Sequence, residues 1–164
     1  MSMKKLFAAK LGLAIVLSLS ACGAPKDEAS SSHAQHQLPN GDVQEKTASA
    51  DKLPKFLDGQ NDTMVAAYKL AAKNTDLLKW IPCYCGCADS ADHKSNQNCF
   101  VKEKLEDGSI VWDDHGTRCI VCVNIAVTSI KMKEEGKTPK EIRTYIDQTY
   151  SKGYAPPTKT EMPS

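Results

Sequence analysis

The chain lacks the excess of basic charge that marks a nucleic-acid-binding protein. It has 21 lysines and arginines against 20 aspartates and glutamates. Lys4, Lys5 and Lys10 lie within residues 1–21, so 18 basic residues remain if that segment is a cleaved leader. Because no basic stripe is left to neutralise phosphates, we expect neither a nucleic-acid partner nor electrostatic binding to lipid head groups.

Motifs of familiar enzyme classes are also missing. The chain has no Ser-His-Asp arrangement and no glycine-rich phosphate loop, so hydrolase and nucleotide-binding functions have no support. One Cys-x-x-Cys sequence occurs, at Cys119 and Cys122. In a thiol–disulfide oxidoreductase, Cys119 would be a nucleophile of low pKa and Cys122 its resolving partner. No βαβ pattern accompanies the two cysteines, as it would in a thioredoxin-like domain. We therefore predict a protein that is not an enzyme and keep the oxidoreductase as an alternative.

The apolar run near the N-terminus, residues 11–19, is too short to span a bilayer as a helix. Lysines precede it, which is the pattern of a secretory signal peptide. The run leads to Leu-Ser-Ala-Cys at Cys22, which is similar to a bacterial lipobox, in which the cysteine becomes the lipid-modified first residue. The sequence thus predicts a signal peptide over residues 1–21 and a lipid anchor on Cys22. Such an anchor would hold the protein at the outer face of the cell membrane without spanning it.

Large apolar residues are scarce just behind this leader. Residues 22–51 are mostly alanine, serine, glutamine, aspartate and lysine, a composition that buries too little surface to offset the entropy of ordering. We predict a lipid-anchored flexible tether there, in which His33 and His36 are solvated. The folded part is predicted as one small Cys/His-rich helical domain over residues 52–154, followed by a proline-rich tail over residues 155–164.

Helix signals dominate the predicted domain. Asp107-Gly108, between apolar residues at even spacing, predicts one short β-hairpin, with a helix over residues 99–106 as the alternative. We predict a mainly α fold: a small cysteine-rich single domain of about three to four helices with a short β-hairpin. Three predicted helices combine a cap or stop signal with apolar residues at helical spacing: one capped by Asn61 or Asp62 and running to about residue 73, one over residues 115–135 before Gly136, and a last helix behind the capping box of Thr138 and Glu141.

Six of the seven cysteines lie within residues 83–122, and the first three stand at every second position. Their stretch reads Pro-Cys-Tyr-Cys-Gly-Cys from Pro82 to Cys87. Cysteines at i and i+2 are poor disulfide partners, because so small a ring violates the separations and dihedral angle of a relaxed bridge. In an extended segment their side chains point to the same side. Such a row of sulfurs suits a soft metal ion.

Further candidate ligands follow in the pattern His-x-x-x-Cys-x-x-Cys. His115 precedes Cys119 and Cys122 with that spacing, and both cysteines are expected on the inward face of a helix. Folded against the first cysteine row, this half-site would complete a tetrahedral zinc site or a thiolate-bridged copper(I) cluster. The predicted metal ligands are Cys83, Cys85, Cys87, His93, Cys99, His115, Cys119 and Cys122.

A structural interpretation of the same cysteines stays open. Six exported cysteines are an even number, and the oxidising exterior of a cell permits disulfides. Cys119 and Cys122 would then bridge one helical turn or pair with the first cysteine group. His93 and His115 would be ordinary hydrogen-bonded loop histidines. The domain would in that case be a disulfide-stapled surface interaction module.

Several of these stretches together resemble one known family, the PCYCGC-motif lipoproteins of Gram-positive, Bacillus-type bacteria. The resemblance spans almost the whole folded domain and implies an exported lipoprotein. As the family is known, a glycine commonly follows the last motif cysteine and another precedes the histidine, where this chain has Ala88 and Asp92. The stretches that carry the resemblance are the row from Pro82 to Cys87, His93-Lys94-Ser95, Cys99-Phe100, Trp112 with His115-Gly116, Cys119-x-x-Cys122 and Pro156-Pro157-Thr158.

The sequence as a whole predicts an exported, lipid-anchored protein that binds a soft metal ion for capture, storage or hand-over. Copper(I) is favoured because thiolates select it, and zinc comes next. A metal donor or acceptor protein is the expected partner, besides the membrane that holds the lipid anchor.

Overall fold

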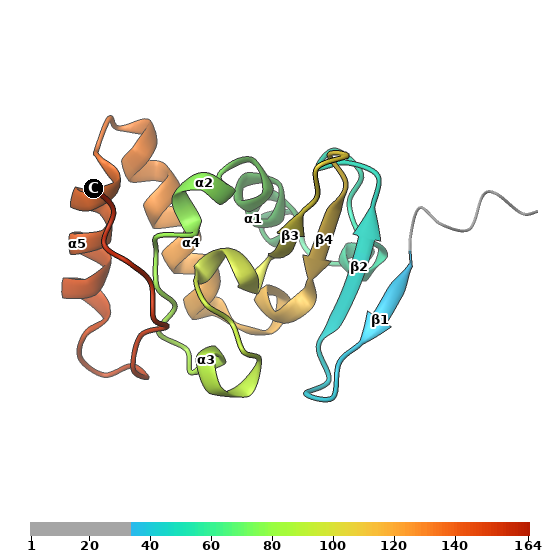
Figure 1. The fold of residues 1–164 in the computed structure, drawn as a ribbon, viewed down its shortest axis with the longest axis horizontal. Helices are drawn as coiled ribbons and strands as arrows, with labels where there is room; N and C mark the ends of the chain where they lie inside the picture. The colour runs from blue at the N-terminus through green and yellow to red at the C-terminus, as the bar shows by residue number, and fades with distance from the viewer. Residues whose placement is uncertain (1–33) are drawn as a thin grey trace, which may run out of the picture.

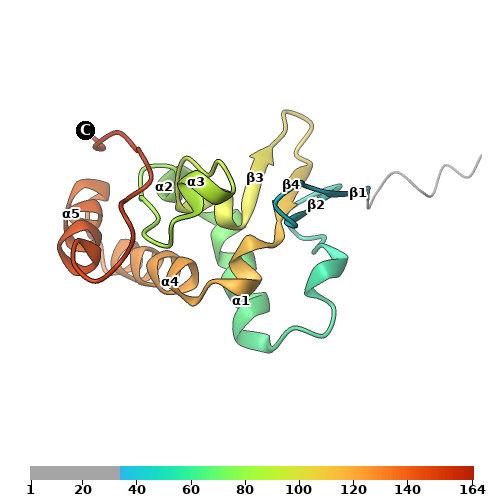
Figure 2. The same ribbon diagram turned by 90° about the horizontal axis from the view of Figure 1, so that it is seen from below.

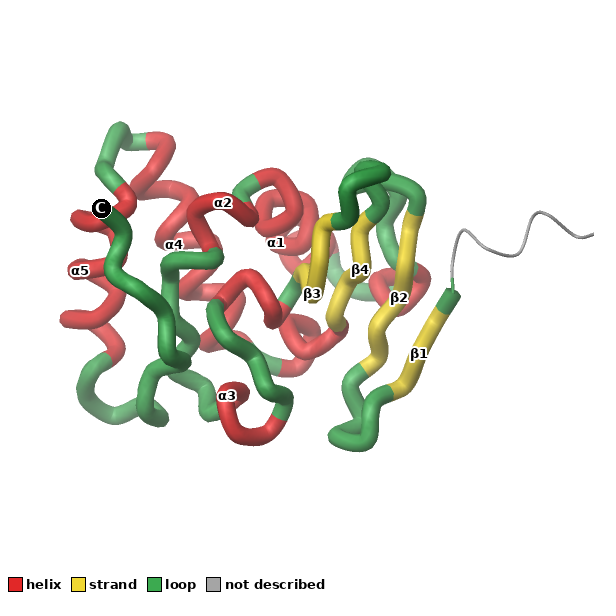
Figure 3. The backbone as a smooth tube through the Cα atoms, in the orientation of Figure 1, coloured by secondary structure: helices red, strands yellow, loops and turns green. Residues whose placement is uncertain are grey.

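The computed structural model describes residues 34–164. The predicted signal peptide, the lipidation site at Cys22 and His33 lie outside the described residues. A sheet and a group of helices lie side by side in the described part, with helix α5 farthest from the sheet (Figure 1). The tube view shows the same division, with strands on one side and most of the helices on the other (Figure 3).

The sheet has four strands in the order β1-β2-β4-β3, and every neighbouring pair is antiparallel. The predicted mainly α fold is therefore wrong, because residues 34–164 hold a four-stranded sheet beside five α-helices. Two of these strands precede residue 52, within the segment that the sequence analysis assigned to the tether. The strands are β1 Gln35–Gln37, β2 Val43–Thr47, β3 Val101–Lys104 and β4 Ile110–Asp113.

Strand β2 was missed because its inward-facing residues are polar. Glu45 and Thr47 are both fully buried, where an apolar alternation would be the usual signal of a strand. The Glu45 carboxylate accepts hydrogen bonds from the backbone N–H of Lys55 at 2.9 Å. The Thr47 hydroxyl accepts one from Trp112 Nε1 at 2.7 Å. Both partners are distant in sequence, so no local pattern announces that these side chains can be buried.

The predicted hairpin is present as β3 and β4. Leu105 and Ser109 pair at its end, with Leu105 donating its N–H to the Ser109 carbonyl at 2.9 Å. Gly108 takes a φ of 83°, which only glycine adopts without strain, and the Asp107 carboxylate accepts a hydrogen bond from the Ser109 N–H at 2.9 Å. The Asp107 side chain, which accepts the N–H two residues further on, and the glycine that follows it therefore form the tight turn.

The three predicted helices are also present. Asn61 caps α1 by accepting a hydrogen bond from the Met64 N–H at 2.9 Å, and Thr138 and Glu141 form the predicted capping box of α5. Within residues 34–164 the five α-helices are α1 Asp62–Lys73, α2 Thr75–Leu78, α3 Cys87–Ser90, α4 Ile120–Glu134 and α5 Pro139–Tyr150, and three short 3-10 helices lie at Lys55–Leu57, Asn96–Cys99 and Asp114–Arg118.

The hydrophobic core joins the sheet to the helices. Tyr68 of α1 packs edge-on against Phe100 at 5.1 Å between ring centroids, and Trp112 of β4 lies beside it at 6.3 Å. All three side chains are fully buried. The hydroxyl of Tyr68 donates to the Asp113 carbonyl at 2.8 Å, so this aromatic group fixes the end of β4, where the chain turns towards α4. No helix within residues 34–164 is long and apolar enough to cross a membrane.

The proline-rich tail returns across the molecule and lies against the cysteine row. Thr158 donates its N–H to the Cys83 carbonyl at 2.9 Å and accepts the Cys83 N–H on its hydroxyl at 2.9 Å. Ala155 donates its N–H to the Tyr84 carbonyl at 3.1 Å. The tail therefore passes between α5 and the segment before α3, as both views of the ribbon show (Figures 1 and 2). It holds the cysteine row in an extended conformation.

Candidate metal centre

The first cysteines project from a short extended segment between α2 and α3. Cys83 and Cys85 are two residues apart in it, and their Sγ atoms lie 3.3 Å from each other, on the same side of the chain as predicted. Gly86 then turns the chain with a φ of 86°, and α3 begins at Cys87. Because Ala155 lies only 3.7 Å from where a Gly86 Cβ would be, the tail also covers this turn.

The loop after α3 brings His93 back to the same place. Its N–H donates to the Cys87 carbonyl at 3.2 Å, and the residue before it, Asp92, takes a φ of 53°. A positive φ costs an L-residue about 1–2 kcal/mol, although aspartate and asparagine tolerate it better than other residues. A glycine at this position would avoid that cost, so Asp92 is a strained residue of the loop.

The second half-site comes from the turn between β4 and α4. The predicted helix from residue 115 begins later than expected, because Asp114–Arg118 forms a 3-10 helix and α4 starts at Ile120. Cys119 is the N-cap residue of α4, and Cys122 lies in its first turn. Gly116 permits a close approach to the preceding segment: a Cβ there would lie 2.7 Å from the Phe100 ring and 2.9 Å from the Cys99 carbonyl oxygen.

Three sulfurs form the centre of the cluster. Cys83 Sγ lies 3.2 Å from Cys122 Sγ, and Cys85 Sγ lies 3.4 Å from Cys122 Sγ. These separations are well above the roughly 2.05 Å of a disulfide bond. All six cysteines within residues 34–164 are free. The disulfide interpretation of the sequence therefore has no counterpart among the described residues.

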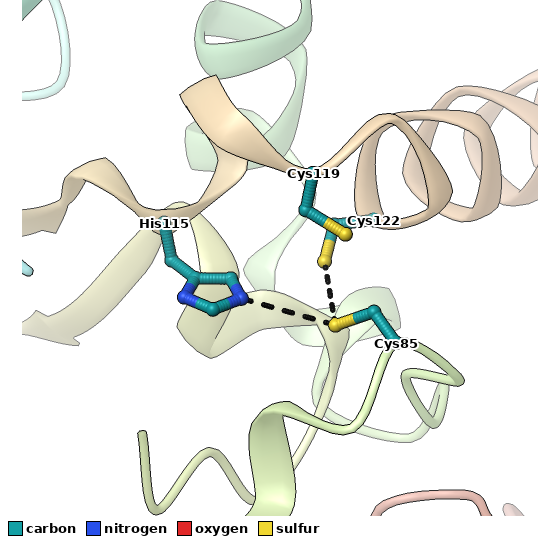
Figure 4. Close-up of side chains that lie close together, drawn as sticks. All are labelled: Cys85, His115, Cys119 and Cys122. Atoms are coloured by element: carbon teal, nitrogen blue, oxygen red, sulfur yellow. Dashed lines mark hydrogen bonds between the residues drawn. The ribbon is translucent and has the colours of Figure 1, made fainter. Parts of the chain in front are cut away.

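One side of the cluster consists of Cys85, His115, Cys119 and Cys122. One ligand atom from each lies within 4.8 Å of the other three. Cys85 Sγ is 3.8 Å from His115 Nε2. The close-up shows Cys85 on its loop facing His115 and the start of α4, with Cys119 just before that helix and Cys122 in its first turn (Figure 4). We call these four residues the outer ligand set, since all but Cys122 are partly exposed.

The other side is fully buried. Cys87 Sγ lies 3.8 Å from Cys99 Sγ, and Cys83 groups with Cys99 and Cys122 within 4.8 Å. His93 is 2% exposed, and neither of its ring nitrogens has a hydrogen-bond partner. Buried polar groups in native proteins are nearly always paired, so an unpaired imidazole beside thiols is an unusual arrangement that calls for a ligand. A ring nitrogen of His93 lies within 4.8 Å of the Cys87 sulfur and of a ring nitrogen of His115. We call the buried residues Cys83, Cys87, His93 and Cys99 the inner ligand set.

Carboxylates stand behind both histidines. Asp42 Oδ2 lies 3.2 Å from His115 Nδ1, on the side of the ring opposite the Cys85 sulfur, and Asp113 Oδ2 lies 3.7 Å from His93 Nε2. A carboxylate behind a metal-ligating histidine orients the ring and makes it a stronger ligand. Neither aspartate was predicted from the sequence. Asp42 reaches the site only through the pairing of β2 with β4. For Asp113 the only local signal was the Asp-Asp-His sequence at residues 113–115.

The pKa values of the cysteine thiols differ within the cluster. Hydrogen bonding from Cys122 lowers the pKa of Cys83 to about 4, and contacts with Cys119 and Cys122 lower that of Cys85. Contacts with Cys119, Cys83 and Cys85 raise the pKa of Cys122. Burial raises the pKa of Cys99. Some sulfurs are thus thiolates and others thiols, because closely spaced like charges cannot all ionise without a compensating cation. A metal cation would allow more of them to ionise together.

The His115 ring is protonated at neutral pH in the metal-free cluster. Its hydrogen bond with the Cys85 sulfur raises its pKa to about 9; burial opposes this shift, and the charge of Asp42 adds to it. Below that pKa the ring is an imidazolium between a thiolate and a carboxylate. Since a metal ligand must be the neutral imidazole, metal binding at this nitrogen releases the proton.

The low pKa that a thiol–disulfide oxidoreductase would need at Cys119 is not found. Contact with Cys122 would lower it, but the neighbouring Cys85 sulfur and burial outweigh that effect and raise the pKa of Cys119. A raised pKa reduces the thiolate fraction that a nucleophilic cysteine needs. The position at the helix N-terminus is therefore not enough to activate this residue.

All eight predicted ligands converge on one cluster, and their spacing fits metal coordination. In a tetrahedral zinc site with Zn–S bonds of about 2.3 Å, neighbouring sulfurs are about 3.8 Å apart. The sulfur separations in the cluster, 3.2 to 3.8 Å, are close to that value. The Cys/His groups could thus hold a metal ion.

Comparison with known proteins confirms the PCYCGC-motif part of the resemblance seen in the sequence. No curated protein and no solved structure matches the chain. A family model described as "Protein of unknown function with PCYCGC motif" matches residues 11–163, which include every residue of the cluster. The chain belongs to the PCYCGC-motif family.

Proposed function

We propose that this protein is an exported, lipid-anchored metal-binding protein, not an enzyme, and that its cargo is a soft metal ion. Copper(I) is the favoured ion and zinc the next. One observation carries the proposal: six free cysteines and two histidines from four separate segments converge on one cluster. Capture, storage or hand-over to a partner protein at the outer face of the membrane would be its role.

The ligand set favours copper(I) over harder ions. Thiolates outnumber imidazoles six to two, and thiolate ligands select copper(I), whereas carboxylate and carbonyl ligands suit magnesium or calcium. Asp42 and Asp113 stand behind the histidines. Zinc accepts the same thiolate and imidazole ligands in closed four-ligand sites, which is why it stays the second candidate.

The exposure of the cluster supports exchange of the ion. Cys85 and Cys119 are partly exposed, whereas Cys83, Cys87 and Cys99 are buried. An ion would therefore enter and leave through the outer ligand set, where a thiol of a partner protein can reach it. Ligand exchange between thiolates of two proteins needs no free ion in solution, which suits hand-over.

The direct test is a competition titration of the full chain with copper(I) and with zinc, each against a chelator of known affinity. Cys85→Ser removes the sulfur that contacts His115, Cys83 and Cys122, and should weaken binding by at least about tenfold. Ala88→Ser places the same serine in α3, next to the cluster but outside it, and should bind as the wild type does.

Three results would contradict the proposal. If neither ion binds the reduced protein, the cluster is not a metal site. If the two serine variants bind equally well, Cys85 is not a ligand. Thiols that react with an alkylating reagent only after reduction would indicate disulfides in the exported protein and favour an interaction module.

A further inference from the structure

The cluster contains more ligand atoms than one metal ion uses. Its six sulfurs and two imidazoles supply eight ligand atoms, whereas a structural zinc site takes four. The outer ligand set, Cys85, His115, Cys119 and Cys122, already makes a complete set of four within 4.8 Å. The inner ligand set is left without a role if only one ion binds.

The inner ligand set has its own reasons to bind a cation. Cys83 and Cys99 are 0% exposed and Cys87 is 1% exposed, so an isolated thiolate there would be a buried charge with little compensation. His93 adds two buried ring nitrogens without hydrogen-bond partners, although Asp113 lies behind the ring at 3.7 Å. A metal ion would neutralise the thiolates and pair the imidazole at once.

The two sets are joined through sulfur. Cys83 of the inner ligand set lies 3.3 Å from Cys85 and 3.2 Å from Cys122, both of the outer ligand set. Cys122 also belongs, with Cys83 and Cys99, to a group whose sulfurs lie within 4.8 Å of one another. A thiolate has lone pairs for two cations, so Cys83 and Cys122 stand where bridging ligands would.

We propose that the cluster binds two metal ions, one at the outer and one at the inner ligand set, close enough together that the thiolates of Cys83 and Cys122, which lie between the sets, can be shared. This inference rests on the proposed function and adds the number of ions and the division of ligands between them. The inner ion is the buried one, held by Cys83, Cys87, Cys99 and His93. The outer ion faces solvent and is the one available for exchange.

The stoichiometry tests this division. Native mass spectrometry of the full chain, purified without oxygen in detergent and loaded with copper(I), should show two ions in the wild type. Cys99→Ser and His93→Gln, two separate losses from the inner ligand set, should each retain the outer ion and bind one ion fewer. Circular dichroism would confirm that each variant is folded, and His93→Gln decides the question if Cys99→Ser is not.

Cobalt(II) loading tests the bridge. Two cobalt(II) ions that share thiolates are magnetically coupled, so the paramagnetic resonance signal should fall as the second equivalent enters the wild type. In His93→Gln, which retains one ion, the signal should persist. A signal that grows in proportion to cobalt through two equivalents would show two unbridged ions and overturn the shared-sulfur arrangement.

The outcomes separate this inference from the proposed function. A wild type that saturates with one ion overturns the two-ion cluster but leaves metal binding intact. A wild type that binds none overturns both. Equal stoichiometry in the wild type and in both inner variants would remove His93 and Cys99 from the ligands.

Discussion

The carboxylate behind His115 should strengthen metal binding by an amount that depends on pH. Asp42→Asn keeps the size of the side chain and removes its charge. Loss of such an outer partner commonly weakens metal binding by about tenfold to a hundredfold. Because the Asp42 Oδ2 to His115 Nδ1 distance of 3.2 Å lies at the long end for a hydrogen bond, we expect the lower limit, about tenfold or about 1.4 kcal/mol.

Protonation of His115 opposes this loss at neutral pH. The pKa of His115 is raised to about 9, and Asp42 contributes to that shift after Cys85. At about pH 7 a metal ion must displace the proton, at a cost of about 2.7 kcal/mol for two pKa units. Asp42→Asn lowers this cost while it also weakens the ligand. The variant should therefore lose less than about tenfold at about pH 7 and the full amount at about pH 10, where His115 is neutral.

Chelator competition with copper(I), wild type against variant at each pH, measures this difference. Asp114→Asn is the matched control, because Asp114 and Asp42 both form ion pairs with Arg118 but only the Asp42 carboxylate pairs with the His115 ring. Equal weakening by the two variants would show that the effect comes through Arg118. A loss that shrinks as pH rises would refute the reasoning about the His115 proton.

Three further predictions concern the frame around the cluster. Asp92→Gly should stabilise the protein by about 0.5 kcal/mol in urea denaturation, since the relief at a φ of 53° exceeds the added entropy of the unfolded chain. Gly116→Ala should destabilise it by about 1–3 kcal/mol in the same assay, because the new Cβ meets the Cys99 carbonyl and the Phe100 ring. Thr158→Val removes the buried acceptor of the Cys83 N–H and should cost about 1–3 kcal/mol; hydrogen exchange at that N–H should become faster.

Each of these predictions has a result that contradicts it. Destabilisation in Asp92→Gly would mean that its contact with Lys94 outweighs the backbone strain. An unchanged midpoint in Gly116→Ala would mean that the turn before α4 can move without cost. Unchanged exchange at Cys83 in Thr158→Val would show that another acceptor replaces the hydroxyl.

The helices were predictable because their signals are local. Asn61 and Thr138 cap the helices that follow them, as their side chains indicate within a few residues of sequence. Strands β1 and β2 were not predictable by the same means. Glu45 is buried because its carboxylate meets the Lys55 N–H and the Gln35 amide, and only the folded sheet brings these groups together.

The candidate site, too, was predictable from the sequence only where its signals are local. The cysteines were found because thiols at close, regular spacing are rare outside metal sites and disulfides. His93 and His115 followed from their nearness to those cysteines. Asp42 could not be found, since it lies 73 residues from His115 and reaches it only through the pairing of β2 with β4.

The contact between residues 155–158 and the cysteine row sets the order in which the cluster can form. Chains are made and exported from the N-terminus, so all six sulfurs leave the ribosome before the segment that hydrogen-bonds to Cys83 and Tyr84. Until residues 155–158 follow, Cys83 and Tyr84 lack these hydrogen-bond partners. An ion that met the chain before that point would encounter the thiols without the contacts that hold the row extended.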